Sequence, residues 1–155
     1  MDRTRATRIA KQAAIGVGVA FVAIQFVPVS RTNPPVESEV PASAEARSVL
    51  RRACYDCHSN ETVWPLYSKI APVSWLVVRD VNEGRKEVNF STWNRLATKE
   101  QIKKLDKSWK EVKEGEMPLW FYLPPHPDAR LSPADRATLR TWALSMGATE
   151  SANPN

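Results

Sequence analysis

Hydrophobic residues are distributed along the chain in two distinct ways. Residues 12–29 form a continuous stretch without a charged side chain, QAAIGVGVAFVAIQFVPV. From residue 44 onward, hydrophobic positions instead recur every three to four residues between polar and charged ones. That spacing is typical of amphipathic helices, whereas strands would alternate with a period of two. The pattern therefore predicts one continuous apolar helix followed by several amphipathic helices.

Four amphipathic helices are expected, and their terminal residues predict where each begins and ends. Ser43 and Ser132 are the expected N-caps of the first and fourth helices, and Thr98-x-x-Gln101 has the pattern of a capping box for the third. A glycine lies at the expected end of the second, third and fourth helices. The expected ranges are 44–54, 72–84, 98–115 and 133–147. The predicted fold class is all-α, with short helices joined by proline-rich loops.

The apolar stretch at 12–29 is long enough to cross a membrane. At 1.5 Å per residue, a helix of that length spans about 27 Å, close to the ~30 Å hydrocarbon layer. The basic residues that precede it are Arg3, Arg5, Arg8 and Lys11. Because basic residues are enriched on the cytoplasmic side, this asymmetry predicts a cytoplasmic N-terminus and export of everything after residue 30.

A cleaved secretory signal is the alternative to an uncleaved anchor. Its one suitable cleavage site, Ala42-Ser43-Ala44, lies farther beyond Val29 than such sites normally lie. Residues 31–43 are polar and proline-rich, which predicts an extended tether. The expected organisation is an anchor or signal sequence at 1–30, a tether at 31–43, one domain at 44–148 and a disordered tail at 149–155.

The net charge of +5 does not predict a nucleic-acid partner. Residues 1–30 carry +3 of it and the remaining residues only +2. The densest basic run, 95–113, is interleaved with acidic residues, which is typical of a solvated helix face rather than a phosphate-binding stripe. We therefore expect no nucleic acid among the partners.

Cys54-Tyr55-Asp56-Cys57-His58 contains the only two cysteines in the sequence. Cys-x-x-Cys-His is the attachment signature of c-type haem. Two thiols three positions apart at a helix end can reach the two vinyl groups on one edge of a porphyrin, and the adjacent imidazole then lies under the iron. The motif predicts one covalent haem on Cys54 and Cys57, with His58 as the proximal iron ligand.

Two other chemistries remain open for this motif. A disulfide or redox dithiol between Cys54 and Cys57 is compatible with an exported domain, but a thioredoxin-like site would need a βαβ pattern that the sequence lacks. A zinc site would need Cys54, Cys57, His58 and His126 together. In that case the adjacent Cys57 and His58 would both have to bind one ion.

The second axial position of the iron has three candidate states. Met117, in Gly115-Glu116-Met117-Pro118, is the expected distal ligand, because its flanking residues place it in a loop and histidine–methionine ligation raises the reduction potential. His126 is the alternative and would give a bis-histidine haem of lower potential. An open or water-bound position is the third. Met146 fits a helix face and is interpreted as structural.

Aromatic and proline residues suggest the surroundings of this site. Trp120, Phe121 and Tyr122 closely follow Met117 and are candidates for an apolar distal wall. A backbone carbonyl in the proline-containing loop 64–72 is a candidate acceptor for the second N–H of His58, which would fix the ring.

From about residue 44 to 148 the sequence resembles the bacterial haem-binding domain proteins, which are small c-type cytochrome-like modules. The matching segments are ACYDCHSNET at 53–62, Trp64-Pro65, IAPVSW at 70–75, NFS-x-W at 89–93, GEMP at 115–118, Tyr122, HPDA at 126–129, Leu131-Ser132 and Trp142. The resemblance implies a cytochrome c-like helical domain behind an N-terminal anchor, with haem held by Cys54, Cys57 and His58.

The expected function is electron transfer rather than catalysis, because an iron with two protein ligands has no free position for a substrate. The expected location is the bacterial inner membrane, crossed once, with the domain in the periplasm and redox proteins as partners there. A haem-based sensor or haem enzyme is the alternative, with an open distal site near His126 or Tyr122. A dithiol or zinc-binding structural module is the third possibility.

Overall fold

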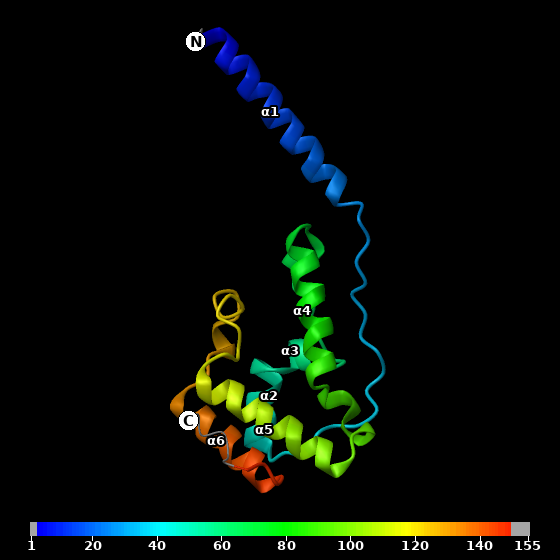
Figure 1. Ribbon diagram of the computed structural model, residues 1–155, viewed down its shortest axis with the longest axis vertical. Helices are drawn as coiled ribbons and strands as arrows, with labels where there is room; N and C mark the ends of the chain where they lie inside the picture. The colour runs from blue at the N-terminus through cyan, green and yellow to red at the C-terminus, as the bar shows by residue number, and fades with distance from the viewer. Residues whose placement is uncertain (1–2, 150–155) are drawn as a thin grey trace. The chain divides into compact units, whose positions relative to one another are not determined.

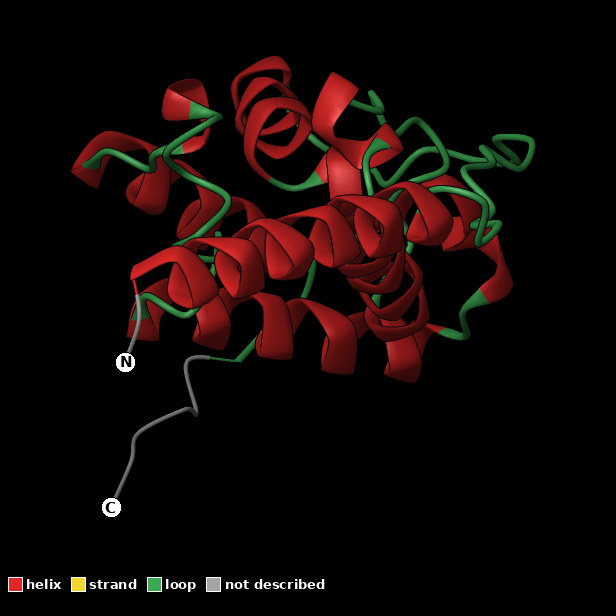
Figure 2. Cartoon of the chain, turned by 90° about the horizontal axis from the view of Figure 1, so that it is seen from above, coloured by secondary structure: helices red, strands yellow, loops and turns green. Residues whose placement is uncertain are grey.

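Helices make up all the regular secondary structure of the chain between residues 3 and 149, which are the residues that the computed structural model describes (Figures 1 and 2). No strand occurs among these residues, so the predicted all-α class is confirmed. The chain divides into two compact units. The first contains the residues up to Thr32 together with Trp64–Asp80, and the second contains Asn33–Val63 and the residues from Val81 onward.

The first unit contains α1 (Arg3–Ile24), the short 3-10 helix η1 (Leu66–Lys69) and the first turns of α4 (Val73–Glu87). None of the residues of α1 is buried. Among residues 3–149, α1 is the one helix long and apolar enough to cross a membrane. It begins earlier than the apolar stretch at 12–29 because the basic N-terminal residues are good helix formers, and it ends before Pro28, which cannot donate a backbone hydrogen bond.

The end of α1 is hydrogen-bonded to the loop before α4. The side-chain amide of Gln25 donates to the carbonyl of Ala71 at 3.1 Å, and its oxygen accepts the N–H of Ala71 at 2.9 Å. Arg31 donates to the carbonyl of Ser68 at 3.3 Å. The first unit is therefore one connected structure and not a helix with a separate loop.

The second unit is built around three helices, α2 (Ala44–Ala53), α5 (Thr98–Glu114) and α6 (Pro133–Ser145). Helix α6 packs against both α2 and α5 (Figure 1). Shorter elements connect them: α3 (Tyr55–His58), η2 (Phe90–Arg95) and η3 (Pro127–Ala129). The buried core is formed by Val40, Ala46, Val49, Leu50, Tyr55, Val88, Phe90, Trp93, Leu105, Val112, Leu139, Trp142, Ala143 and Ala148.

The segment predicted as a tether is extended, but most of it is packed onto the second unit. Val40 is 1% exposed and belongs to the core. The indole of Trp142 donates to the carbonyl of Pro41 at 2.8 Å, and Glu37 forms an ion pair with Arg95. The buried valine and these backbone and side-chain partners hold the predicted tether against the rest of the second unit. Of the predicted tail, Thr149 donates to Asp106 at 2.6 Å, and residues 150–155 lie outside the described residues.

The third helix begins as predicted but is capped differently. Helix α5 starts at Thr98 with Ala97 as its N-cap, and the N–H of Ala97 donates to the carboxylate of Glu100 at 3.2 Å. The amide of Gln101 instead donates to the carbonyls of Trp93 and Leu96, at 3.2 and 3.1 Å. The Thr98–Gln101 capping box is therefore wrong, because Glu100 occupies the position that reaches back to the N-cap.

Helix α6 has the predicted Ser132 cap, and Asp135 completes a capping box with it. Asp135 also forms an ion pair with Arg52 of α2. The guanidinium of Arg52 and, next, the hydroxyl of Ser132 lower the pKa of Asp135 from 3.8 to about 2. Because the folded pKa is depressed, the carboxylate stabilises the fold above about pH 3.8, and this contribution is lost as the pH falls through about 2.

Asp135→Asn should therefore destabilise the domain by about 1 kcal/mol at pH 7, the typical cost of losing a helix cap together with a partly exposed ion pair. The difference from the wild type should shrink as the pH approaches 2. Urea unfolding of the detergent-solubilised protein at several pH values measures both effects. Asp128→Asn is the matched control, since no ion pair of Asp128 is present among the described residues. Equal stability of Asp135→Asn and wild type at pH 7 would contradict the assignment.

Candidate functional site

The Cys-x-x-Cys-His motif forms a single tight turn at the end of α2. The N–H of Cys54 donates to the carbonyl of Leu50 at 2.9 Å, which closes α2, and the N–H of His58 donates to the carbonyl of Cys54 at 2.9 Å. Among the described residues, Cys54 and Cys57 form no disulfide, and both are half-buried. The structure therefore brings Cys54, Cys57 and His58 together within one helical turn, as the sequence predicts.

His58 is oriented by the backbone of α4 and of the residue that follows it. Its Nδ1 lies 2.9 Å from the carbonyl oxygen of Gly84 and 3.2 Å from that of Val88. Both partners are acceptors, so Nδ1 carries the hydrogen and Nε2 has its lone pair available. Nε2 has no hydrogen-bond partner among the described residues. Burial lowers the pKa of His58, with the hydrogen bonds to Val88 and Gly84 acting in the opposite direction. A neutral imidazole with a free Nε2 is suited to bind a metal.

The predicted acceptor for His58 in loop 64–72 is wrong. The acceptors come from Gly84 and Val88, because α4 does not end at Gly84 as the glycine pattern predicts but continues to Glu87. Sequence reasoning missed these residues, since a main-chain carbonyl carries no sequence signal of its own.

Gly84 lets α4 approach the motif closely. A Cβ on this residue would lie 2.5 Å from the carbonyl oxygen of Cys57 and 3.0 Å from its carbonyl carbon. Those atoms are backbone, so they can give way only if a whole segment moves. Gly84 is therefore required for packing and not for ending a helix. A glycine inside an otherwise continuous helical pattern was the signal that could have identified it.

The residues after His58 are fixed by buried hydrogen bonds. Ser59 and Thr62 are both buried, and the hydroxyl of Thr62 donates to the carbonyl of Asp56 at 2.7 Å. From α4, the guanidinium of Arg85 donates to the carbonyl of Ser59 at 2.8 Å and to the hydroxyl of Thr62 at 2.9 Å. Consecutive residues of α4, Gly84 and Arg85, thus hold the imidazole and the loop that follows it.

A cluster of aromatic rings surrounds the proximal side of the site. Phe90 stacks on Tyr55 with ring centroids 5.6 Å apart, and its centroid lies 6.3 Å from those of both His58 and Trp93. The indole nitrogen of Trp93 is buried without a hydrogen-bond partner among the described residues. This indole N–H is a hydrogen-bond donor, and Phe90 lies near both Trp93 and His58. The aromatic residues therefore supply an apolar environment next to His58, and the core beside them contains an unpartnered donor.

The distal candidates lie on the loop between α5 and α6. Met117 is partly buried and packs against the core, while the ring of His126 stacks on Tyr122 with centroids 4.1 Å apart. The hydroxyl of Tyr122 donates to Asp56, between the two cysteines, at 2.7 Å. The contact of Tyr122 with the motif connects this loop to the candidate attachment site.

The three aromatic residues predicted to form a distal wall are placed differently from one another. Tyr122 contacts the motif, whereas Trp120 is 80% and Phe121 48% exposed, and these two contact each other edge to face. Met146, interpreted as structural, is the C-cap of α6 and packs against the core.

The zinc alternative requires four ligands around one ion. No group of three or more His, Cys, Asp or Glu side chains suited to a metal ion occurs within residues 3–149. Burial, followed by repulsion from Cys57, raises the pKa of Cys54 to about 12, so this thiol is neutral at physiological pH. A haem iron, whose porphyrin already supplies four nitrogens, needs at most two ligands from the protein and is compatible with this arrangement.

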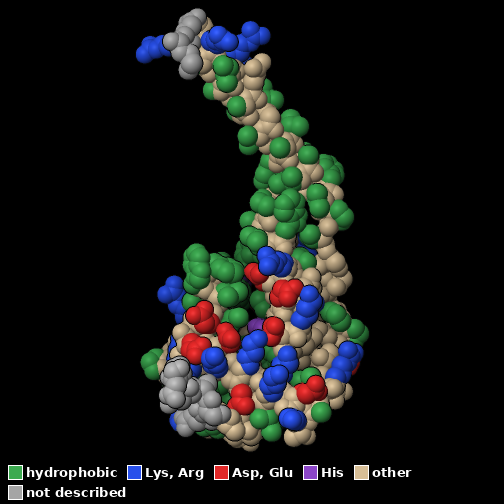
Figure 3. Space-filling view, viewed as in Figure 1, with side chains coloured by type: hydrophobic (Ala, Val, Ile, Leu, Met, Phe, Trp, Pro, Cys, Tyr) green, Lys and Arg blue, Asp and Glu red, His purple; other side chains and the backbone are tan. Residues whose placement is uncertain are grey.

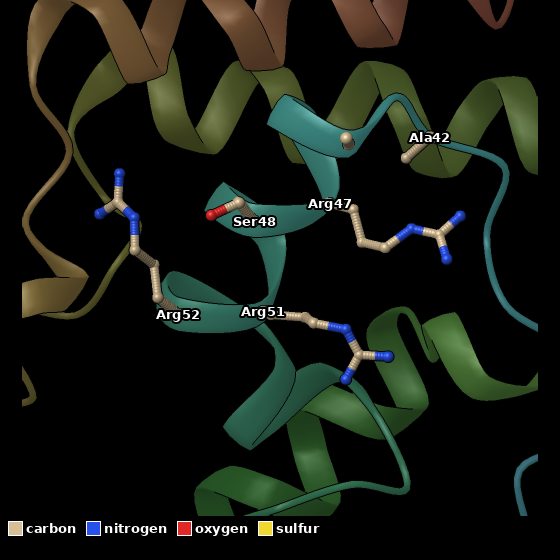
Figure 4. Close-up of a pocket in the computed structure, with 6 residues that line it drawn as sticks. Ala42, Arg47, Ser48, Arg51 and Arg52 are labelled. Carbon is tan, nitrogen blue, oxygen red and sulfur yellow. The ribbon is translucent and has the colours of Figure 1, made fainter.

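A shallow depression beside α2 is lined by three arginines, but their charges are compensated. Arg47 and Arg51 extend to one side of the helix and Arg52 to the other (Figure 4). Glu39 pairs with Arg47 and Arg51, and Arg52 pairs with Asp135. Glu61 also forms an ion pair with Arg51. The depression therefore offers no unpaired guanidinium to an anion.

The family model described as haem-binding domain matches residues 19–145, which is most of the chain and includes every site residue discussed above. No curated protein and no solved structure matches the chain significantly.

Proposed function

Because the chain belongs to the haem-binding domain family, we propose that it is a membrane-anchored, single-haem c-type cytochrome that transfers electrons. Haem binding follows from the family. The observation that carries the finer proposal is the fixed orientation of His58. Its Nδ1–H donates to the carbonyls of Gly84 and Val88, and its Nε2 is available next to the thiols of the motif.

The residues of the site fit a covalently attached haem. Cys54 and Cys57 would hold the porphyrin edge through thioethers, and His58 would bind the iron through Nε2. When bound, haem supplies a one-electron redox couple. The carbonyls of Gly84 and Val88 keep the imidazole in one tautomer and make it a stronger donor to a metal. The aromatic cluster around Phe90 excludes water from the proximal side.

Helix α1 supports the proposed anchoring. Its 22 residues span about 33 Å as a helix, enough for the hydrocarbon layer, and all its charges lie near the N-terminus. We therefore place the chain in the bacterial inner membrane, crossed once, with the haem domain in the periplasm. Its partners there would be other redox proteins, bound through small and transient interfaces. Met117 remains the proposed distal ligand and His126 its alternative.

A haem-stained denaturing gel tests covalent attachment. The matured wild-type chain should retain peroxidase-active haem, because thioethers survive denaturation, and Cys54→Ala combined with Cys57→Ala should lose all of the stain. Ser145→Ala is a suitable control, since its hydroxyl only bonds the carbonyl of Trp142 within α6. A wild-type chain that matures normally but does not stain, with both thiols open to alkylation, would contradict the proposal.

A haem-based sensor or haem enzyme is the second candidate function. It is favoured by the packing of Met117 against the core and by the stacking of His126 on Tyr122, since both side chains already have partners. In that case the iron would keep an open position. Rapid binding of carbon monoxide to the ferrous wild type would favour the sensor over the electron carrier.

A further inference from the structure

Exposed hydrophobic side chains are concentrated in the residues just before and at the start of α4. Leu66 is 75% and Leu76 58% exposed, and Ile70, Val73 and Trp75 are also exposed. We call residues 64–76 the apolar segment. Five of the nine large hydrophobic residues exposed between residues 30 and 149 lie in it. Contiguous exposed apolar surface of this kind marks a site of interaction with a protein, a ligand or a membrane.

The apolar segment is attached directly to the end of α1. Gln25 follows the last residue of α1 and makes two hydrogen bonds with the backbone of Ala71, at 2.9 and 3.1 Å. Arg31 adds a third bond to Ser68. Hydrophobic side chains cover both α1 and the N-terminal end of α4 (Figure 3). If α1 crosses a membrane, these bonds hold the apolar segment at the surface where the helix emerges.

The composition of the apolar segment matches a membrane surface. No acidic residue occurs within the segment, whereas Lys69 is present and exposed. Trp64, Tyr67 and Trp75 supply aromatic rings, which are enriched at the level of lipid headgroups. Exposed leucines, aromatic rings and a basic side chain without acids form the pattern of an element lying in the interface plane.

We propose that the apolar segment lies in the headgroup region of the bilayer that α1 crosses, so that the chain contacts the membrane through a second element. This inference rests on the proposed anchoring by α1. Its occupant is the lipid surface, because the segment is hydrogen-bonded to the residues that follow α1 and carries a basic residue, Lys69, but no acid. Protein partners and the haem itself are the other apolar surfaces that could cover it.

Fluorescent labels at single cysteines test the depth of the segment. Leu66→Cys and Leu76→Cys are each labelled with a thiol-reactive NBD dye in the full-length, haem-loaded chain, and Lys103→Cys on the exposed side of α5 is the control. The proteins are inserted in phosphatidylethanolamine–phosphatidylglycerol vesicles with and without lipids carrying a nitroxide at carbon 5. The emission of the wild-type chain treated with the dye is subtracted from the emission of each labelled variant.

The nitroxide lipids should lower emission at positions 66 and 76 by about half, since an interfacial element lies ~5–10 Å into the headgroup boundary, and should leave position 103 unchanged. Equal responses at 66, 76 and 103 in a chain that resists carbonate extraction would overturn the inference and leave the anchor standing. Loss of the haem spectrum on labelling Leu76→Cys would assign the surface to haem and also overturn it. Extraction of the chain from the vesicles by carbonate would overturn both the anchor and the inference. Labelling of the wild-type chain by the dye, at the two cysteines of the motif, would overturn only the covalent attachment of haem.

Discussion

Replacing Gly84 with alanine should destabilise the domain by about 1–3 kcal/mol, the usual cost of overpacking, and should release His58 from its backbone acceptors. The added Cβ would lie 2.5 Å from the carbonyl oxygen of Cys57, so α4 has to move away from the motif. The same displacement lengthens the bonds from Nδ1 to the carbonyls of Gly84 and Val88, which are 2.9 and 3.2 Å long. The imidazole then loses its fixed orientation, which would weaken the proposed ligation of the iron.

Two measurements separate these effects of Gly84→Ala. Thermal or urea unfolding gives the loss of stability, and the optical spectrum of the ferric protein shows whether the iron has become partly high-spin through weaker histidine ligation. Gly18→Ala is the matched control, because no atom lies within 4 Å of the position of its Cβ. A Gly84→Ala protein with wild-type stability and spectrum would show that the close approach of α4 to Cys57 does not exist in solution.

Replacing Met117 with alanine should open the second axial position of the iron. If the thioether binds the iron, the ferric protein should lose the weak absorption band near ~695 nm that accompanies methionine ligation, and its reduction potential should fall. Carbon monoxide should then bind the ferrous variant rapidly, because no protein ligand has to be displaced first. These changes are large because they alter the coordination of the iron and not merely its surroundings.

Met146→Ala is the control for this experiment. It removes the same side chain from a position that also packs against the core, at the C-cap of α6, so it reproduces any effect of a lost core contact. His126→Ala tests the alternative ligand. If Met117→Ala leaves the spectrum unchanged while His126→Ala alters it, the haem is bis-histidine and His126 must leave its stack on Tyr122 to bind. If neither variant changes the spectrum, the distal position is open, as in the sensor interpretation.

The fixed tautomer of His58 suits the proposed role in electron transfer. Its Nδ1–H has two carbonyl partners and its pKa is lowered by burial, so the ring stays neutral and keeps one orientation at physiological pH. The bond from Nδ1–H to a carbonyl also raises the basicity of Nε2. A rigid axial ligand limits the rearrangement that accompanies a change in the charge of the iron.

The sequence by itself determined the helical class, the approximate bounds of the four amphipathic helices and the grouping of Cys54, Cys57 and His58. These features depend on interactions between residues a few positions apart, namely apolar spacing near 3.6, caps such as Ser132 and a turn that closes from Cys54 to His58. Such interactions are local, so they can be read directly from the order of residues. The apolar helix near the N-terminus was predictable for the same reason.

Only the tertiary structure decided what surrounds the motif. The acceptors of His58 are the carbonyls of Gly84 in α4 and of Val88 just after it, 26 and 30 positions along the chain. The need for glycine at position 84 arises from the backbone of Cys57. Likewise, the residues that looked like a linker are held by the burial of Val40 and the indole of Trp142. These outcomes depend on contacts between distant segments and on main-chain carbonyls, which every residue carries. Composition and spacing therefore do not identify the partners, although a glycine inside the helical pattern marks position 84.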